Sequence, residues 1–139
     1  MSTPDSPRHI HIAAALLMRD DGMTLVVRKR GTKAFLQPGG KLEPGESPEA
    51  ALHRELSEEL VITGTLGEPV PMGQFTAAAA NEAGALVVAD LFLVHVSGEI
   101  APQAEIEEIC WIAPASPGSI ELAPLTRDEV LPALLRRAG

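Results

Sequence analysis

The chain has 139 residues, of which 45% are hydrophobic and 22% are charged, and this composition favours a single globular domain over a disordered chain. Its 19 acidic and 11 basic residues give a formal net charge of −8. This charge repels phosphate backbones and argues against a nucleic-acid polymer as the main partner, while the single cysteine, Cys110, excludes an internal disulfide.

The first predicted elements are a mobile tail and a hairpin of two strands. Residues 1–8 hold two prolines and small polar residues, which predicts a mobile tail and not a signal peptide. Residues 9–19 and 23–30 are rich in apolar residues and flank an Asp-Asp-Gly turn, so they predict the two strands. The longest apolar run, from Ile12 to Met18, is too short to span a bilayer, and we expect a cytoplasmic protein without membrane contact.

The rest of the chain predicts two helices among further strands. Residues 35–45 contain two prolines and three glycines, which predicts a shaped loop. Ser47, Pro48 and Glu49 then open a helix that is predicted to run to about Val61. The remaining predicted elements are a short strand within 65–75, a hairpin tip at 77–85, strands at 86–96 and 106–112, a connection at 114–124 and a terminal amphipathic helix at 125–137. Together they predict a mixed α and β fold in a single domain over residues 9–139.

Three glutamates share one face of the first predicted helix. Residues advance about 100° along a helix, so Glu55, Glu58 and Glu59 lie on the same side. Leucines at neighbouring positions are expected to be buried, which places the carboxylates at the border of the core. An acidic helix face is also typical of solvated surface, and the three glutamates alone leave both interpretations open.

The loop before this helix favours a metal site. The pair Gly39 and Gly40 lets backbone carbonyls approach a ligand closely. Hard divalent cations such as Mg²⁺ prefer oxygen ligands from carboxylates, carbonyls, water and phosphate. Glu46 and Arg54 are placed so that they could hold this loop against the helix.

The spacing of these residues resembles a known family motif. Gly40 is followed after five residues by Glu46 and after seven more by Arg54-Glu55-Leu56-Ser57-Glu58-Glu59. This stretch resembles the Nudix box, G-x5-E-x7-R-E-U-x-E-E-x-G-U, in which U is a bulky aliphatic residue. Val61 stands where the box has its final glycine. We therefore expect Gly64 to end the helix, at the position where glycine adopts a left-handed backbone most easily.

The resemblance implies a fold and a set of site residues. The fold is an α/β/α sandwich of the α+β class around a mixed β-sheet, with the box helix on one side and the terminal helix on the other. Mg²⁺ or Mn²⁺ is implied as the cofactor, bound by Glu55, Glu58, Glu59 and the backbone carbonyl of Gly39. Arg54 is implied to orient the glutamates.

The resemblance also predicts a residue that anchors the loop and a set of candidates for the general base. Glu46 is implied to anchor the loop. The general base varies within the family, and Glu58 or Glu59 could serve. A glutamate of the acidic strand ending in Trp111 is a further candidate, with Glu108 preferred to Glu105, although both are equally typical of solvated strand charges.

Substrate contacts are predicted at three further positions. Arg28 leads from the second strand into the loop, Lys41 lies within the loop, and both could meet phosphate. Phe35 could form a stacking wall for a base. Each has a simpler interpretation, namely surface charge for the two cations and core packing for the phenylalanine.

The function implied by the resemblance is cleavage of the pyrophosphate linkage of a nucleoside diphosphate linked to another group. A small nucleotide partner is expected, and a nucleoside triphosphate hydrolysed by a MutT-like enzyme is preferred because the chain has no tyrosine and no room for an extra domain. The alternatives are another diphosphate, such as a dinucleoside polyphosphate or a nucleotide sugar, and a non-catalytic nucleotide sensor on the same fold. The sequence leaves the oligomeric state open, a homodimer included.

Overall fold

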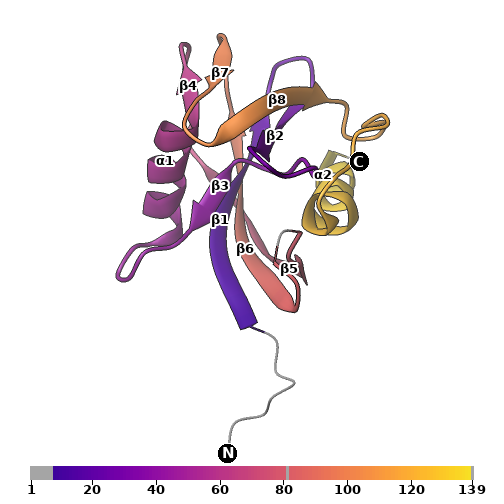
Figure 1. Ribbon diagram of the computed structural model, residues 1–139. Helices are drawn as coiled ribbons and strands as arrows, with labels where there is room; N and C mark the ends of the chain where they lie inside the picture. Colours follow the sequence, from indigo (N-terminus) through magenta and orange to yellow (C-terminus); the bar gives the residue numbers. More distant parts are fainter. Residues whose placement is uncertain (1–7, 81, 139) are drawn as a thin grey trace, which may run out of the picture.

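The computed structural model describes residues 8–80 and 82–138 (Figure 1). The predicted tail, residues 1–8, lies outside the described residues except for Arg8, which is the first residue of β1. None of the helices in the described ranges is long and apolar enough to cross a membrane.

A mixed sheet of six strands forms the centre of the fold. Its order is β5-β6-β1-β2-β8, and β3 pairs with β1 off this path. The strands of this sheet are β1 (Arg8–Met18), β2 (Thr24–Lys29), β3 (Gly39–Lys41), β5 (Val70–Ala78), β6 (Ala85–His95) and β8 (Ile106–Ile112). β1 and β6 run parallel along their whole length, whereas the other pairs are antiparallel. The long apolar sequences of β1 and β6 agree with this arrangement, because parallel central strands are buried on both faces.

The strands β1 and β2 pair as a hairpin beside their turn. Farther from the turn, both strands form hydrogen bonds to the loop that follows β2. The two strands pair beside the turn, where Met18 lies opposite Thr24. Farther along, Leu36 exchanges backbone hydrogen bonds with Val27, and the Ala15 N–H donates to the Pro38 carbonyl at 3.0 Å. The predicted shaped loop is therefore strand-like in part, because these buried strands need partners for their backbone groups.

Two helical layers cover the two faces of the sheet, so the predicted sandwich is confirmed (Figure 1). Alternate residues of β1 divide between the faces. Ala13 and Leu17 pack with buried leucines of α1 (Pro48–Glu59). Leu16 packs with Leu125 and Leu134 of the C-terminal helical layer, which consists of η1 (Leu125–Val130) and α2 (Leu131–Ala138).

The C-terminal helical layer begins with a π-helical turn that the sequence pattern did not predict. The Leu131 N–H donates to the Thr126 carbonyl five residues earlier. Pro132 follows and has no N–H to continue the usual ladder. This wide turn buries the side chain of Thr126 completely, and π-turns of this kind occur frequently at functional sites.

The end of α1 differs from the prediction. The helix ends at Glu59, and Leu60 is already extended, with its N–H donating to the Leu56 carbonyl. Residues Leu60–Ile62 form β4, which pairs with β7 (Ile100–Pro102), and Val61 is 45% exposed within β4. Val61 therefore stands in a strand, where β-branched residues are favoured.

Gly64 does not end the helix, so its predicted role was wrong. Its φ lies outside the left-handed region, and it follows β4 by two residues. A Cβ at this position would collide with the carbonyl of Ser97. Gly64 is required by a close approach of two backbones and not by a helix cap.

Replacement of Gly64 by alanine tests this contact. Gly64→Ala is expected to lower the free energy of unfolding by about 1–3 kcal/mol, because the new methyl group forces the two backbones apart. Val61→Ala, at an exposed position of β4, is the matched control and should change the free energy of unfolding by about 0.5 kcal/mol or less. Urea unfolding measures both, and a Gly64→Ala protein as stable as wild type would contradict the close approach.

Candidate active site

Two adjacent glycines join the central sheet to the acidic helix. Gly39 has φ +150°, and a Cβ there would collide with the backbone of Ala13 in β1. At Gly40, a Cβ would overlap the carboxylate of Glu55. The glycine pair therefore allows β3 to lie against β1 on one side and the carboxylates of α1 to approach its backbone on the other.

Arg54 binds the loop between β3 and α1 to the helix. Its Nε and Nη2 donate to the two carboxylate oxygens of Glu46, each at 2.8 Å, and Nη2 also donates to the Lys41 carbonyl at 3.0 Å. Glu46 additionally accepts from the backbone N–H of Glu43 at 2.9 Å. The hydrogen bonds from Arg54 lower the pKa of Glu46 to about 2. The bidentate pair is the strong form of such contacts and fixes the loop geometry.

Glu59, the last residue of α1, is a buried carboxylate. Its exposed fraction is 3%, and its Oε1 accepts from the Gly39 N–H at 3.2 Å. Its Oε2 is buried and has no hydrogen-bond partner among the described residues. Burial raises the pKa of Glu59 to about 7, although the Gly39 N–H opposes this shift. A buried carboxylate oxygen without a donor is costly unless a cation balances it.

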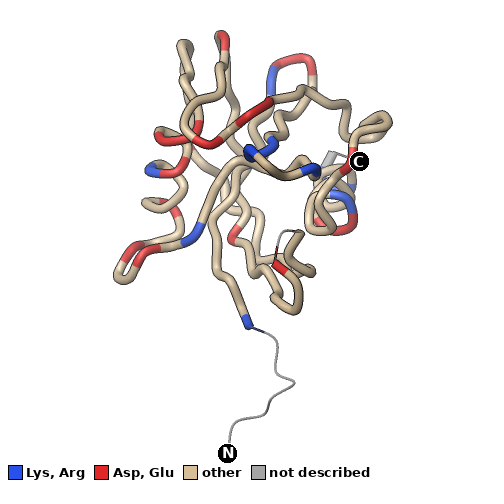
Figure 2. The backbone as a smooth tube through the Cα atoms, viewed as in Figure 1, with Lys and Arg blue, Asp and Glu red and all other residues tan. Residues whose placement is uncertain are grey.

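Glu55 and Glu58 turn toward Arg54. The Arg54 Nη1 lies 3.0 Å from Glu55 Oε2 and 3.6 Å from Glu58 Oε2. Burial raises the pKa of Glu55, and the neighbouring Glu58 raises it further. Figure 2 shows how acidic residues gather on α1 and the loop before it. The two carboxylates lie close to each other, and the shared guanidinium of Arg54 offsets part of their repulsion.

The three glutamates do not converge on one point. Over residues 8–80 and 82–138, no group of three His, Cys, Asp or Glu side chains is arranged to hold a metal ion. Two carboxylates face Arg54, and the third faces Gly39. The donor set nevertheless fits a hard divalent cation, because it consists of oxygens, concentrates negative charge and includes the unpartnered Oε2 of Glu59.

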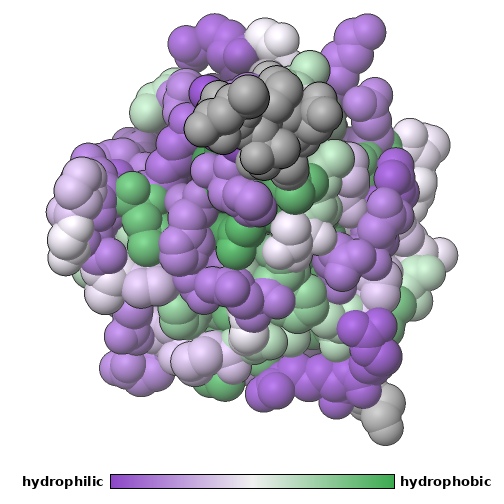
Figure 3. All heavy atoms as spheres, turned by 90° about the horizontal axis from the view of Figure 1, so that it is seen from below, coloured by the Kyte–Doolittle hydropathy of each residue, from purple (hydrophilic) through white to green (hydrophobic). Residues whose placement is uncertain are grey.

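A cavity of about 530 Å³ is lined by Glu55 and by Gly39, the hydrogen-bond partner of Glu59. This volume is in the range of small-molecule sites. Charged lining residues include Lys29, Lys41, Arg54, Glu55 and Glu105. Uncharged lining residues include Ile10, Ile12, Gln37, Val87, Leu125 and Thr126. Figure 3 views the end of the molecule at which β1 begins, and hydrophobic side chains reach the surface there between hydrophilic ones.

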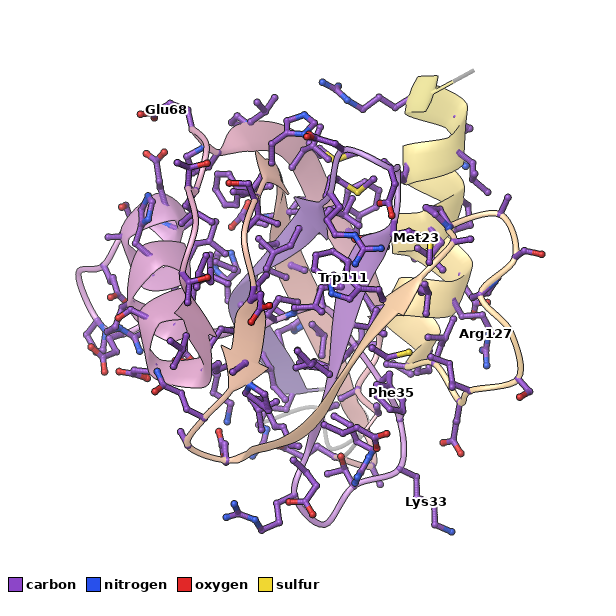
Figure 4. The ribbon with its side chains drawn as sticks, turned by 90° about the horizontal axis from the view of Figure 1, so that it is seen from above. Met23, Lys33, Phe35, Glu68, Trp111 and Arg127 are labelled. Carbon is purple, nitrogen blue, oxygen red and sulfur yellow. The ribbon has the colours of Figure 1, made fainter. Side chains whose placement is uncertain are left out.

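Six of the residues predicted to take part do not line this cavity, namely Arg28, Phe35, Glu46, Glu58, Glu59 and Glu108. Phe35, labelled in Figure 4, is a buried core residue that packs with Val26 and Leu131, so it cannot stack on a base in this cavity. Arg28 donates to Glu108 Oε1 at 3.0 and 3.1 Å, and neither residue lines the cavity. Their mutual contact across β2 and β8 explains why both face away from the carboxylates.

Glu105, the second candidate for the general base, lines the cavity, and so do residues that the sequence did not single out. Lys29 and Glu105 lie on the charged part, with 3.9 Å between Lys29 Nζ and Glu105 Oε1. Gln37 and Thr126 are buried polar residues on the uncharged part. One signal in the sequence pointed to Gln37, because it is a polar residue directly before the Pro-Gly-Gly segment. Thr126 gave a comparable signal as a polar residue on an otherwise apolar helix face.

Known proteins share this fold and motif. Over 70 residues, the chain is 36% identical to an 8-oxo-dGTP diphosphatase of Haemophilus influenzae, which covers 48% of this chain and 52% of that protein. Over another 70-residue match it is 43% identical to a CTP pyrophosphohydrolase of Escherichia coli, covering 47% of this chain and 50% of that protein. The matched region thus spans about half the length of these curated relatives.

Comparison of structures and families extends the similarity to the whole fold. The crystal structure of a MutT protein from Methanosarcina mazei superposes with a TM-score of 0.77 at 24% identity, covering 96% of this chain and 97% of that one. The family model of the NUDIX domain matches residues 7–134. This match includes the glycine pair, the Arg54 contacts and all three glutamates of α1. The chain therefore belongs to the Nudix family.

Proposed function

We propose that the protein is a metal-dependent pyrophosphohydrolase that acts on a nucleoside triphosphate. The observation that carries this proposal is the buried Glu59 carboxylate, whose Oε2 has no partner among the described residues and whose Oε1 accepts from Gly39 at the wall of the cavity. The names of the two curated relatives, a diphosphatase and a pyrophosphohydrolase that act on nucleotides, support the reaction class. The size of the cavity supports a small-molecule substrate.

The proposed cation is Mg²⁺ or Mn²⁺, since Nudix hydrolases generally use divalent metal ions and the donors here are hard oxygens. Glu55, Glu58, Glu59 and the carbonyl of Gly39 would hold it. When bound, such a cation polarises phosphate oxygens and lowers the pKa of a coordinated water. Gly40 leaves the space in which the Glu55 carboxylate lies.

The chain's own cations would position the substrate. Lys41 is exposed at the edge of the cavity, where its ammonium group can meet a terminal phosphate. Arg54 holds the loop through Glu46 and balances part of the charge of Glu55 and Glu58. In this division, Lys41 contacts the substrate and Arg54 keeps the carboxylates in place.

Glu105 is the better supported general base of the two strand glutamates. It precedes β8 and lines the cavity, whereas Glu108 is bound by Arg28 away from it. A carboxylate at the cavity can accept a proton from the attacking water, provided that it comes within hydrogen-bond reach. The order preferred from the sequence, Glu108 before Glu105, is therefore reversed in this proposal.

Removal of single carboxylates from α1 tests the metal role. Glu59→Gln and Glu58→Gln are each expected to lower turnover of a nucleoside triphosphate by about a thousandfold or more with Mg²⁺ in excess, because each removes a ligand oxygen. Circular dichroism should show an intact fold for both. Glu49→Gln, an exposed position in the first turn of the same helix, is the matched control and should keep near-wild-type turnover.

Turnover is measured by chromatography of the products from a panel of nucleoside triphosphates. A chelator should abolish it in the wild-type protein, and added Mg²⁺ or Mn²⁺ should restore it. Near-wild-type turnover in both glutamine variants would refute the proposed metal site. Failure of the whole panel with either metal would refute the proposed reaction.

A second pair of variants tests the general base. Glu105→Gln is expected to lower kcat by roughly 10²–10⁴-fold, because the proton acceptor is lost. Glu108→Gln, the same change on β8 at a residue outside the cavity, should alter kcat by only a small factor. The reverse ranking of the two variants would return the role to Glu108.

A further inference from the structure

A buried polar pair joins two distant parts of the chain at the cavity. Gln37 is 4% exposed and directly precedes the Pro-Gly-Gly segment, whereas Thr126 is fully buried in the π-helical turn η1. The Thr126 hydroxyl donates to the Gln37 side-chain oxygen at 2.8 Å. Both residues line the cavity beside the carboxylates. The pair therefore fixes the orientation of one amide group at the wall of the proposed substrate site.

The other end of this amide has no partner. Gln37 Nε2 is buried and makes no hydrogen bond to any residue in the described ranges. A buried amide nitrogen with two N–H donors and no acceptor is destabilising, and native proteins rarely keep one without a reason. Because Thr126 already occupies the amide oxygen, the unused capacity of Gln37 is that of a donor.

The surroundings of the pair suit a flat, mostly apolar group. Ile10, Ile12 and Leu125 line the same cavity, and within residues 8–80 and 82–138 no aromatic side chain does so. A base held there lies between aliphatic side chains and gains little discrimination from stacking. Within the same described ranges, the uncharged polar side chains of the lining are those of Gln37 and Thr126. Hydrogen bonds that distinguish one base from another then depend on Gln37 and Thr126.

We propose that Gln37 is a specificity-determining residue that donates a hydrogen bond to a keto oxygen of the nucleobase, with Thr126 holding the amide in that orientation. This inference rests on the proposed function. The Gln37 donor selects keto bases, such as hypoxanthine, guanine and uracil, over bases that carry an amino group at the corresponding position. An amino group would place its own donors against Nε2 and leave both unsatisfied.

The proposal is tested by nucleotide binding, which is separate from hydrolysis. Inosine and adenosine 5′-monophosphates differ at position 6, where one has a keto and the other an amino group. Calorimetric titration of the wild-type protein is expected to give a tenfold to hundredfold lower Kd for the inosine nucleotide, roughly the effect of one buried hydrogen bond. Uridine and cytidine monophosphates form a second pair with the same expected direction.

Variants of the pair connect this preference to its residues. Gln37→Met keeps the length of the side chain without its donor and should bring the ratio of the two Kd values close to one. Thr126→Val should reduce the ratio because it releases the amide, and Thr126→Ser should restore it. Gln74→Met, the same substitution on β5 away from the cavity, is the control and should leave the ratio unchanged.

Each outcome separates this inference from the proposed function. A keto preference that Gln37→Met abolishes supports the inference, even if no triphosphate is hydrolysed. The inference would be overturned if the wild-type protein bound the keto and amino nucleotides of each pair equally, preferred the amino nucleotide, or bound none of the four. It would also be overturned if the keto preference survived in Gln37→Met. Turnover of triphosphates with Mg²⁺ or Mn²⁺, measured in parallel, decides the proposed function independently.

Discussion

The burial of the Glu59 carboxylate is the constraint on which the rest of this structure depends. Helix α1 places it at its last turn, and the Gly39 N–H supplies one hydrogen bond, leaving Oε2 without a partner. Burial raises its pKa to about 7, which shows how strongly the site disfavours an uncompensated charge. The partner of Glu59 is fixed in turn by the sheet, because only glycine at position 39 lets β3 lie this close to the backbone of β1.

The polar groups of the site are of two kinds, those that are hydrogen-bonded within the protein and those that lack a partner. Arg54 donates to both oxygens of Glu46, and its other donors meet the Lys41 carbonyl and the carboxylates of Glu55 and Glu58, so the loop is tied to α1 by several contacts. Glu59 and Gln37, by contrast, each retain one buried polar atom without a partner. Unsatisfied groups beside a cavity are expected where a ligand completes them. The satisfied contacts maintain the fold, and the unsatisfied ones define the proposed binding site.

Much of the fold could be predicted from local sequence signals. The N-cap at Ser47 and the apolar runs predicted the helix and the main strands, and the resemblance to the family implied the sandwich. The features that could not be predicted depend on contacts distant in sequence. The early end of α1 follows from pairing of β4 with β7, and the need for Gly64 arises from the backbone of Ser97, 33 positions later in the numbering.

Contacts between residues distant in sequence also explain why only part of the candidate site could be predicted. The spacing of the box placed Arg54, Glu46 and the helix glutamates in one region, because these residues lie close in sequence. The choice between Glu105 and Glu108 depends on the register of β8 against β2, and the pairing of Gln37 with Thr126 joins residues 89 positions apart. Local patterns carry no information on either. The positions of these side chains are therefore determined by sheet register and by the position of the C-terminal helical layer.

The central claim is that Glu59 is a buried ligand for a divalent cation. Calorimetric titration of Mn²⁺ into the wild-type protein and into Glu59→Gln tests it most directly, without any substrate. The account predicts a saturable site in the wild-type protein and an affinity at least about 10- to 100-fold weaker in the variant, because a ligand oxygen is lost. Equal Mn²⁺ affinity in the two proteins would contradict it.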